Sequence, residues 1–112
     1  MLKQNILRKQ ADFDKLYKNG KSAGDRYVVV FARPNGLEIT RTAFLASKKV
    51  GNSVARNRAR RLMKESYRLS LADIPTGMDI IFIARNTIKN KKQDEVERSL
   101  RAALTKVGII QR

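Results

Sequence analysis

The residues best suited to chemistry are the basic side chains concentrated in residues 48–68. This segment of 21 residues carries eight Lys and Arg residues and a single acid, Glu65. At about 100° per residue, a helix through it would be basic on one face and largely apolar on the other. The basic face would present Arg56, Asn57, Arg60, Arg61, Lys64 and Arg68, and the opposite face Ala55, Ala59, Leu62, Ser66 and Leu69. One face would be anchored in the protein and the other presented to a partner.

The predominance of arginine on this face points to a polyanion as the partner. Guanidinium groups bind phosphate through paired hydrogen bonds and stack on unpaired bases. Like charges four residues apart, such as Arg56 and Arg60, destabilise an isolated helix by roughly 0.2–0.5 kcal/mol per pair, and a bound phosphate chain would reverse that cost. Arg58 is predicted at the edge of the apolar face, where only its tip would reach phosphate. A merely solvated face is the alternative, although such faces usually mix both signs of charge.

A second set of candidates is the aromatic pair Phe13 and Tyr17. The two residues lie four apart and therefore share a face of a helix. The ordinary interpretation is a stripe that packs into the core. The pair is flanked by Lys15, Lys18 and Lys21, and this combination also suits stacking of unpaired bases beside a phosphate chain. The residues alone leave both interpretations open.

Composition restricts the chemistry that the side chains could perform themselves. The chain has no His and no Cys, which excludes imidazole and thiolate metal sites, His-based triads and disulfides. Its ten acidic residues are dispersed, whereas a two-metal nuclease needs carboxylates that converge on one point. We therefore predict no catalytic residue and no metal site in the protein itself, and a protein-only metal nuclease is disfavoured.

Charge and length describe a small basic protein. Its 112 residues include 25 Lys and Arg against 10 Asp and Glu, which gives a formal net charge of +15. This excess favours nucleic acid as the partner. We predict a single RNA-binding domain over residues 1–112, because no repeat or linker divides the chain. No apolar run approaches the roughly 20 residues that cross a bilayer, and residues 1–10 lack the apolar region of an export signal. We expect a cytoplasmic protein that makes no membrane contact.

The first half of the chain is predicted to form a short helix and two strands. Phe13, Leu16 and Tyr17 indicate a helix over residues 11–18 that ends at Asn19 and Gly20. Strand-like segments at 27–32 and 40–47 flank a turn and indicate an antiparallel hairpin. Alternation along the first strand would place Tyr27 and Phe31 together on one face.

The second half is predicted to form a long helix, a buried strand and a last helix. Ser53 is predicted to cap a helix that runs to about residue 71. The continuous apolar run at 79–85 predicts a buried strand, and a final helix begins at residue 92 or 94 and ends near 107. The order αββαβα indicates an α+β two-layer sandwich, with helices on one face of the sheet and Tyr27 and Phe31 on its open face.

Residues 47–62 resemble the Arg-Asn-Arg signature of the bacterial ribonuclease P protein subunit. They run Ser-Lys-Lys-Val-Gly-Asn-Ser-Val-Ala-Arg-Asn-Arg-Ala-Arg-Arg-Leu, a long match without gaps. Residues 12–21, Asp-Phe-Asp-Lys-Leu-Tyr-Lys-Asn-Gly-Lys, are similar to the first-helix segment of that family. Residues 79–85, Asp-Ile-Ile-Phe-Ile-Ala-Arg, are similar to its last strand. The resemblance covers nearly the whole chain.

The resemblance implies a subunit that joins a catalytic RNA and assists removal of the 5′ leader from precursor tRNA. The RNA would carry out the hydrolysis with Mg²⁺ that it mainly holds itself, and no obligate protein partner is implied. Contacts to the catalytic RNA would be made by Arg56, Asn57, Arg58, Arg60, Arg61, Lys64 and Arg68. The leader would lie in a cleft between the first helix and the open sheet face, lined by Phe13, Tyr17, Phe31, Lys48 and Lys49.

The family fold is a mixed sheet of the ribosomal protein S5 domain 2-like type. Its parallel strands are joined by a left-handed βαβ crossover, against the strong general preference for right-handed ones. Phe31 stands where the family often has Tyr, and Tyr17 where Phe is usual, so ring area is kept while a hydroxyl contact from position 31 is lost. The alternative function is a ribosomal or RNA-assembly protein that binds structured RNA, which would share the charge and the α+β class.

Overall fold

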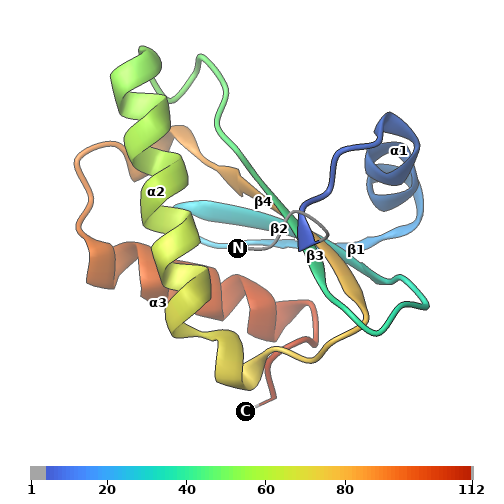
Figure 1. Cartoon of the computed structure of the whole chain (residues 1–112). Coiled ribbons are helices and arrows are strands. Elements are labelled where there is room, and N and C mark those ends of the chain that lie inside the picture. The colour runs from blue at the N-terminus through green and yellow to red at the C-terminus, as the bar shows by residue number, and fades with distance from the viewer. Residues whose placement is uncertain (1–4, 112) are drawn as a thin grey trace.

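Three α-helices and four strands form the fold of residues 5–111, which are the residues that the computed structural model describes (Figure 1). In chain order they are α1 (Gln10–Asn19), β1 (Lys21–Gly24), β2 (Val28–Pro34), β3 (Arg41–Leu45), α2 (Ser53–Leu69), β4 (Met78–Ala84) and α3 (Gln93–Lys106). Short 3₁₀ turns follow α2 and β4, at η2 (Leu71–Asp73) and η3 (Asn86–Ile88). Residues 1–4 and 112 lie outside the described residues. They include both ends of the predicted domain and part of the segment considered for an export signal.

The sheet has the strand order β1-β2-β4-β3, and β4 lies between the two strands that were expected to form a hairpin. β2 pairs antiparallel with β4, and β3 pairs parallel with it, so that Val30 and Phe44 both lie beside Phe82. The hairpin prediction is therefore wrong. The physical reason is that β4 is apolar on both faces, with Ile80, Ile81 and Phe82 fully buried, and the central position buries it best.

β1 is a strand that the sequence patterns did not predict. It forms the true hairpin with β2, in which Lys21 pairs with Ala32 and Gly24 with Val29. Its sequence, Lys-Ser-Ala-Gly, has no β-branched or aromatic residue, so its propensity for a strand is low. Pairing with β2 decides its conformation, and the order of elements becomes αβββαβα.

The main core lies between one face of the sheet and the helices α2 and α3. Val28, Val30 and Ala32 of β2 alternate with residues of the other face and meet Ile80, Phe82 and Ala84 of β4. The helices contribute larger apolar groups that fill this layer, among them Met63, Tyr67, Val96, Leu100 and Leu104. The predicted α+β class is confirmed, and β3, α2 and β4 form the parallel βαβ unit for which the resemblance implies a left-handed crossover.

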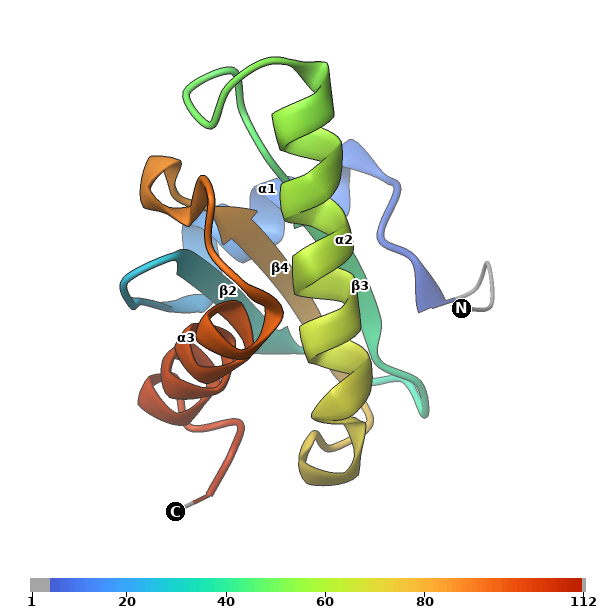
Figure 2. The same cartoon turned by 90° about the vertical axis from the view of Figure 1, so that its left-hand side faces the viewer.

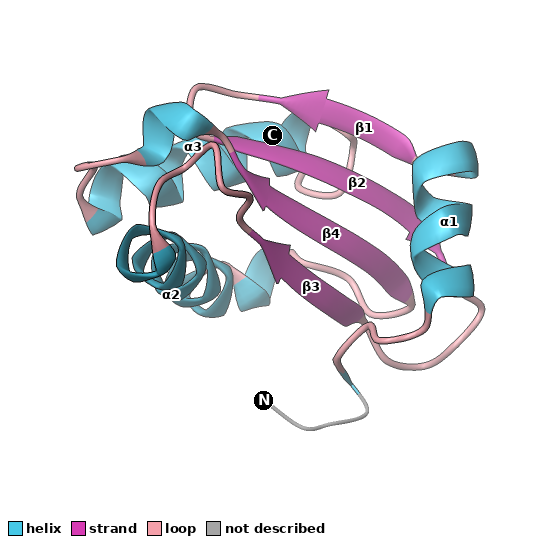
Figure 3. Cartoon of the chain, turned by 90° about the horizontal axis from the view of Figure 1, so that it is seen from above, coloured by secondary structure: helices cyan, strands magenta, loops and turns pink. Residues whose placement is uncertain are grey.

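The opposite face of the sheet carries a smaller core under α1. Leu16 of α1 is fully buried against Ile81 of β4 and Ala43 of β3, and Phe13 and Phe31 pack at the edge of this cluster. α1 crosses only one end of this face, whereas α2 and α3 lie on the other side of the sheet (Figures 1 and 3). A large part of the face beside α1 is left without a covering helix.

The N-terminus of α2 is capped by Asn52 and not, as predicted, by Ser53. The Asn52 side-chain oxygen accepts a hydrogen bond of 3.0 Å from the backbone N–H of Ala55, and Ser53 is the first helical residue. We expect Asn52→Ala to lower the free energy of unfolding by about 1 kcal/mol, because an N–H of the first turn loses its acceptor. Ser53→Ala should change it little. Urea unfolding of the two variants measures this difference, and equal losses would contradict the assignment of the cap.

Candidate RNA-binding surfaces

The outward face of α2 carries most of the residues predicted to contact a catalytic RNA. Four of them are exposed, namely Asn57, Arg61, Lys64 and Arg68. The remaining three lie half-buried on the flanks of the helix, namely Arg56, Arg58 and Arg60. The helix therefore presents a basic face to solvent over residues 57–68, and the structure brings these seven predicted residues together on one element.

The buried side of α2 differs in one respect from the predicted apolar face. Met63 and Tyr67 are its largest buried members, and the Tyr67 ring lies 5.5 Å from that of Phe82, centroid to centroid. Leu69 was predicted on this side, but it is 48% exposed. The buried face of α2 is therefore the one that carries Met63 and Tyr67. Leu69, the last residue of the helix, lies outside this face and points toward solvent.

Local contacts hold several of these basic groups in place. Arg60 donates a hydrogen bond to the side-chain oxygen of Asn57, one turn earlier. Arg68 forms an ion pair with Glu65, the only acid of the segment. Their hydrogen bond lowers the pKa of Glu65 and raises that of Arg68. Of the four exposed residues, Arg61 and Lys64 form no ion pair within the described chain.

Arg58 is engaged with another part of the protein. Its Nη2 donates a hydrogen bond of 2.7 Å to the backbone oxygen of Lys91, in the segment that leads into α3. This agrees with the predicted position at the edge of the apolar face, where the side chain lies along the protein surface. Part of its hydrogen-bonding capacity thus serves the protein itself.

A groove of about 920 Å³ is associated with this helix. Its walls combine apolar groups with basic ones that belong to the predicted RNA contacts, namely Arg58, Arg61, Leu62, Lys64, Tyr67, Arg68 and Leu71. Polar groups and one acid complete it, namely Asn5, Thr40, Thr42, Glu65 and Gln93, so its basic residues outnumber its single carboxylate by four to one. The surface around α2 is therefore both hollowed and cationic, which suits a bulky polyanion.

The three predicted leader-binding aromatics gather under α1. The rings of Tyr17 and Phe31 meet edge to face, with their centroids 5.1 Å apart. Phe13 and Phe31 each pack against the smaller core and remain half-buried, while Tyr17 is 44% exposed. Partial burial raises the pKa of the Tyr17 hydroxyl, because the charged phenolate is disfavoured away from water. The core interpretation holds for Phe13, whereas Tyr17 is exposed and contacts Phe31, and the stacking of bases on this pair stays a prediction.

Lys48 and Lys49 are exposed in the turn between β3 and α2. β3 runs from the end of the sheet crossed by α1 toward this turn, so the two lysines lie at the far end of the strand (Figure 3). The structure therefore separates them from the aromatic group along the length of the open sheet face.

Tyr27 does not join Phe31, contrary to the prediction from strand alternation. It precedes β2, which begins at Val28, and it packs against the main core on the α3 side. Its backbone N–H donates to the Ser99 hydroxyl at 3.0 Å, and the Lys91 ammonium lies 5.4 Å from its ring centroid. Alternation does not extend to Tyr27 because the chain is still turning from β1 into β2 there.

Family-level comparison matches residues 1–108 to Ribonuclease P. The chain belongs to the ribonuclease P protein family. It is 43% identical over 110 residues to the ribonuclease P protein component of Alkaliphilus metalliredigens, covering 98% of this chain and 99% of that protein. It is 44% identical over 109 residues to that of Clostridium botulinum strain Loch Maree, covering 96% and 98%. The resemblance noted in the sequence is thus confirmed.

Solved structures of ribonuclease P proteins share this fold. The protein from Staphylococcus aureus superposes with a TM-score of 0.85 at 31% identity, over 96% of this chain and 98% of that one. The protein from Thermotoga maritima gives a TM-score of 0.78 at 31% identity, over 87% of this chain and 92% of that one. The mixed sheet and the placement of its helices are therefore those of the ribonuclease P protein family.

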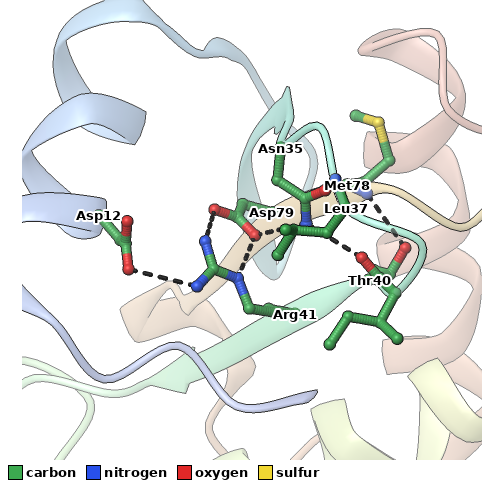
Figure 4. A network of polar contacts seen from close by, with 8 residues as sticks. Asp12, Asn35, Leu37, Thr40, Arg41, Met78 and Asp79 are labelled. Carbon is green, nitrogen blue, oxygen red and sulfur yellow. Dashed lines mark hydrogen bonds and ion pairs between the residues drawn. The ribbon is translucent and has the colours of Figure 1, made fainter. Parts of the chain in front are cut away.

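A polar network that the sequence reasoning missed fixes α1 to the sheet (Figure 4). Arg41 of β3 donates from Nε and Nη2 to both oxygens of Asp79, at 2.8 and 2.7 Å, and it contacts Asp12 of α1 at 3.4 Å. Asn35 donates to Asp79 at 2.9 Å and to the backbone oxygen of Ile39 at 3.0 Å. The hydrogen bond to Asp79 raises the pKa of Arg41. Asp12 directly precedes Phe13, so this network holds the helix that carries the aromatic pair.

The sequence contained only a weak signal for this network. Asp79 is one of the ten dispersed acids, yet it is buried, and an acid at the start of an otherwise apolar strand requires a partner. Which cation serves could not be derived, because it depends on the parallel pairing of β3 with β4, which places Arg41 beside Asp79.

Within residues 5–111, no group of three or more acidic side chains is arranged to hold a metal ion. None of the helices there combines the length and the apolar character that a membrane span requires.

Proposed function

We propose that this chain is the ribonuclease P subunit that binds the catalytic RNA through α2 and the 5′ leader of precursor tRNA beside α1. Family membership makes it a protein component of ribonuclease P, which implies an RNA subunit as its partner. The observation that supports the more detailed proposal is the presence of two separate surfaces whose chemistry suits nucleic acid. One is a continuous cationic helix face, and the other is an aromatic group beside an open sheet face.

The α2 face is suited to binding phosphate. Arg61 and Lys64 project side by side with no acid to neutralise them, which is unfavourable until a polyanion supplies the missing charge. Phosphate could also compete with Glu65 for Arg68, because the Glu65–Arg68 pair is exposed and such pairs contribute only about 0–1 kcal/mol. Binding would release counterions from the RNA, so it should weaken steeply as salt rises.

The aromatic group is suited to unpaired nucleotides. Bases of a single strand can stack on ring faces, and each stacked base contributes about 1–3 kcal/mol. A leader strand that passes Tyr17 and Phe31 and continues along the open sheet face would reach Lys48 and Lys49 at its other end. Precursor tRNA would thereby gain contacts that mature tRNA lacks, which favours release of the product.

The chemical step itself is assigned to the RNA partner. Mg²⁺ takes carboxylate oxygens as its protein ligands, and residues 5–111 hold no cluster of three acidic side chains that could cage it. Mg²⁺ is proposed to be held mainly by the RNA of the assembled particle. The protein's contribution is charge neutralisation and substrate selection, and such a particle would act where tRNA precursors occur, in the cytoplasm.

Reconstitution with the cognate catalytic RNA tests this assignment. At low Mg²⁺ the protein should stimulate leader cleavage, and Arg61→Gln should weaken RNA binding several-fold while lowering the salt slope by about one, as expected for one lost phosphate contact. Arg98→Gln is the matched control, because it removes the same charge from an exposed residue that already pairs with Asp94. Cleavage that is no faster with the protein than without it would reject the assignment.

A further inference from the structure

We propose that residues 85–92, the β4–α3 loop, form a second phosphate-binding site for the RNA that binds α2. The inference rests on the proposed function and extends it to a segment whose charge alone does not distinguish it from an ordinary solvated loop. The loop includes η3 and passes beside α2 (Figure 2). Its ligand would be the sugar-phosphate backbone of a structured RNA.

The loop has the charge of a phosphate-binding element. Four of its eight residues are basic, namely Arg85, Lys89, Lys91 and Lys92, and none is acidic. Lys89 and Lys92 are exposed, and no residue of the described chain forms an ion pair with a lysine of the loop. Of the two acids that begin α3, Asp94 pairs with Arg98 at 3.7 Å, and Glu95 accepts the backbone N–H of Lys92 at 2.9 Å without forming an ion pair with a lysine of the loop.

The loop is held firmly, unlike an ordinary solvated connection. Ile88 at its centre is only 1% exposed and belongs to the main core. The Lys91 N–H donates to the Ile88 oxygen at 3.1 Å, and the Arg85 N–H donates to the Tyr27 oxygen at 2.9 Å. The Thr87 hydroxyl donates to the backbone oxygen of Arg26. A loop already ordered in this way loses little conformational entropy when its lysines bind phosphate.

Arg58 couples this loop to the basic face of α2. Its 2.7 Å hydrogen bond to the Lys91 oxygen ties the position of the loop to that of the helix, so the two cationic elements form one surface. An RNA backbone that crosses the exposed face at Arg61 would meet the loop on the α3 side of the helix. Arg58 then acts chiefly as a positioning residue, and its remaining N–H groups are available to the same phosphates.

Salt-dependent binding of the catalytic RNA alone tests the site. The double variant Lys89→Gln/Lys92→Gln should bind at least several-fold more weakly, with a salt slope reduced by about two. The matched control Arg98→Gln/Lys106→Gln removes the same charge from α3 residues that already pair with Asp94 and Asp25, and its slope should stay near the wild-type value. Circular dichroism confirms that both variants are folded. Equal slopes in the two variants would overturn the proposal, since they would reflect net charge alone.

A double-mutant cycle between Arg58 and Lys89 tests the coupling. If Arg58 positions the loop, Arg58→Gln should abolish most of the loss caused by Lys89→Gln, so that the two effects are not additive. Additive losses would overturn the positioning role. Failure of the loop site is distinguishable from failure of the proposed function, because only the latter would also leave Arg61→Gln with wild-type RNA affinity.

Discussion

Replacing Arg41 by methionine is expected to lower the free energy of unfolding by about 3–5 kcal/mol, because the buried Asp79 would lose its cation. The Asp79 side chain is 6% exposed, and Arg41 contacts both of its oxygens. Without Arg41, the amide of Asn35 would be its remaining side-chain partner. Methionine keeps much of the apolar stem, so the loss reports the charge and its hydrogen bonds.

Two comparisons separate this effect from the loss of any arginine. Arg101→Met breaks a pair with Asp73 of the same 2.7 Å length, but both side chains are substantially exposed, and we expect a change within about 1 kcal/mol. Adding Asp79→Asn to Arg41→Met should recover part of the stability, since the uncompensated charge is removed. Urea unfolding measures all three variants. A loss for Arg41→Met no larger than that for Arg101→Met would contradict the structural role of the network.

The same network explains why the elements were predictable and their pairing was not. α1, α2, α3 and β4 follow from local periodicity, apolar runs and end signals, and each was predicted to within a few residues. The parallel pairing that brings Arg41 of β3 beside Asp79 of β4 spans 38 residues, and no local pattern encodes it. A turn between two strand-like segments usually predicts a hairpin. Here β4, which is more apolar, lies between the two strands and pairs with both.

The candidate surfaces were predictable to different degrees for a related reason. The basic face of α2 lies on one helix, so a period of 3.6 residues identifies it. The prediction for the buried side was wrong at Leu69, which is exposed, and it missed Met63 and Tyr67. The aromatic group required two elements, α1 and β2, whose contact the sequence did not show. Its assignment before the structure depended on the family resemblance. The charge of the β4–α3 loop does not reveal that Ile88 anchors it in the core and that Arg58 bonds to it, because both contacts come from the tertiary structure.

Replacing Phe31 by alanine should weaken binding of precursor tRNA to the reconstituted particle by about 10- to 100-fold, while binding of mature tRNA stays near the wild-type value. The estimate is the loss of one stacked base, about 1–3 kcal/mol. The ring also supports Tyr17 through their edge-to-face contact, so alanine would remove part of a second platform. Equilibrium binding of the two RNAs, which differ only in the leader, measures the ratio directly.

The controls for this prediction separate stacking from packing. Phe31→Leu keeps apolar contact with the smaller core under α1 but has no aromatic ring, so it should lose precursor selectivity while retaining most of the stability. Phe31→Tyr and Tyr17→Phe keep both rings and should retain selectivity, unless a hydroxyl contributes a hydrogen bond of its own. If Phe31→Leu bound precursor tRNA as tightly as the wild type, the ring would serve only the core. The leader would then have to be held by the lysines at the far end of β3, and Lys48→Gln/Lys49→Gln would become the variant that loses the preference for precursor.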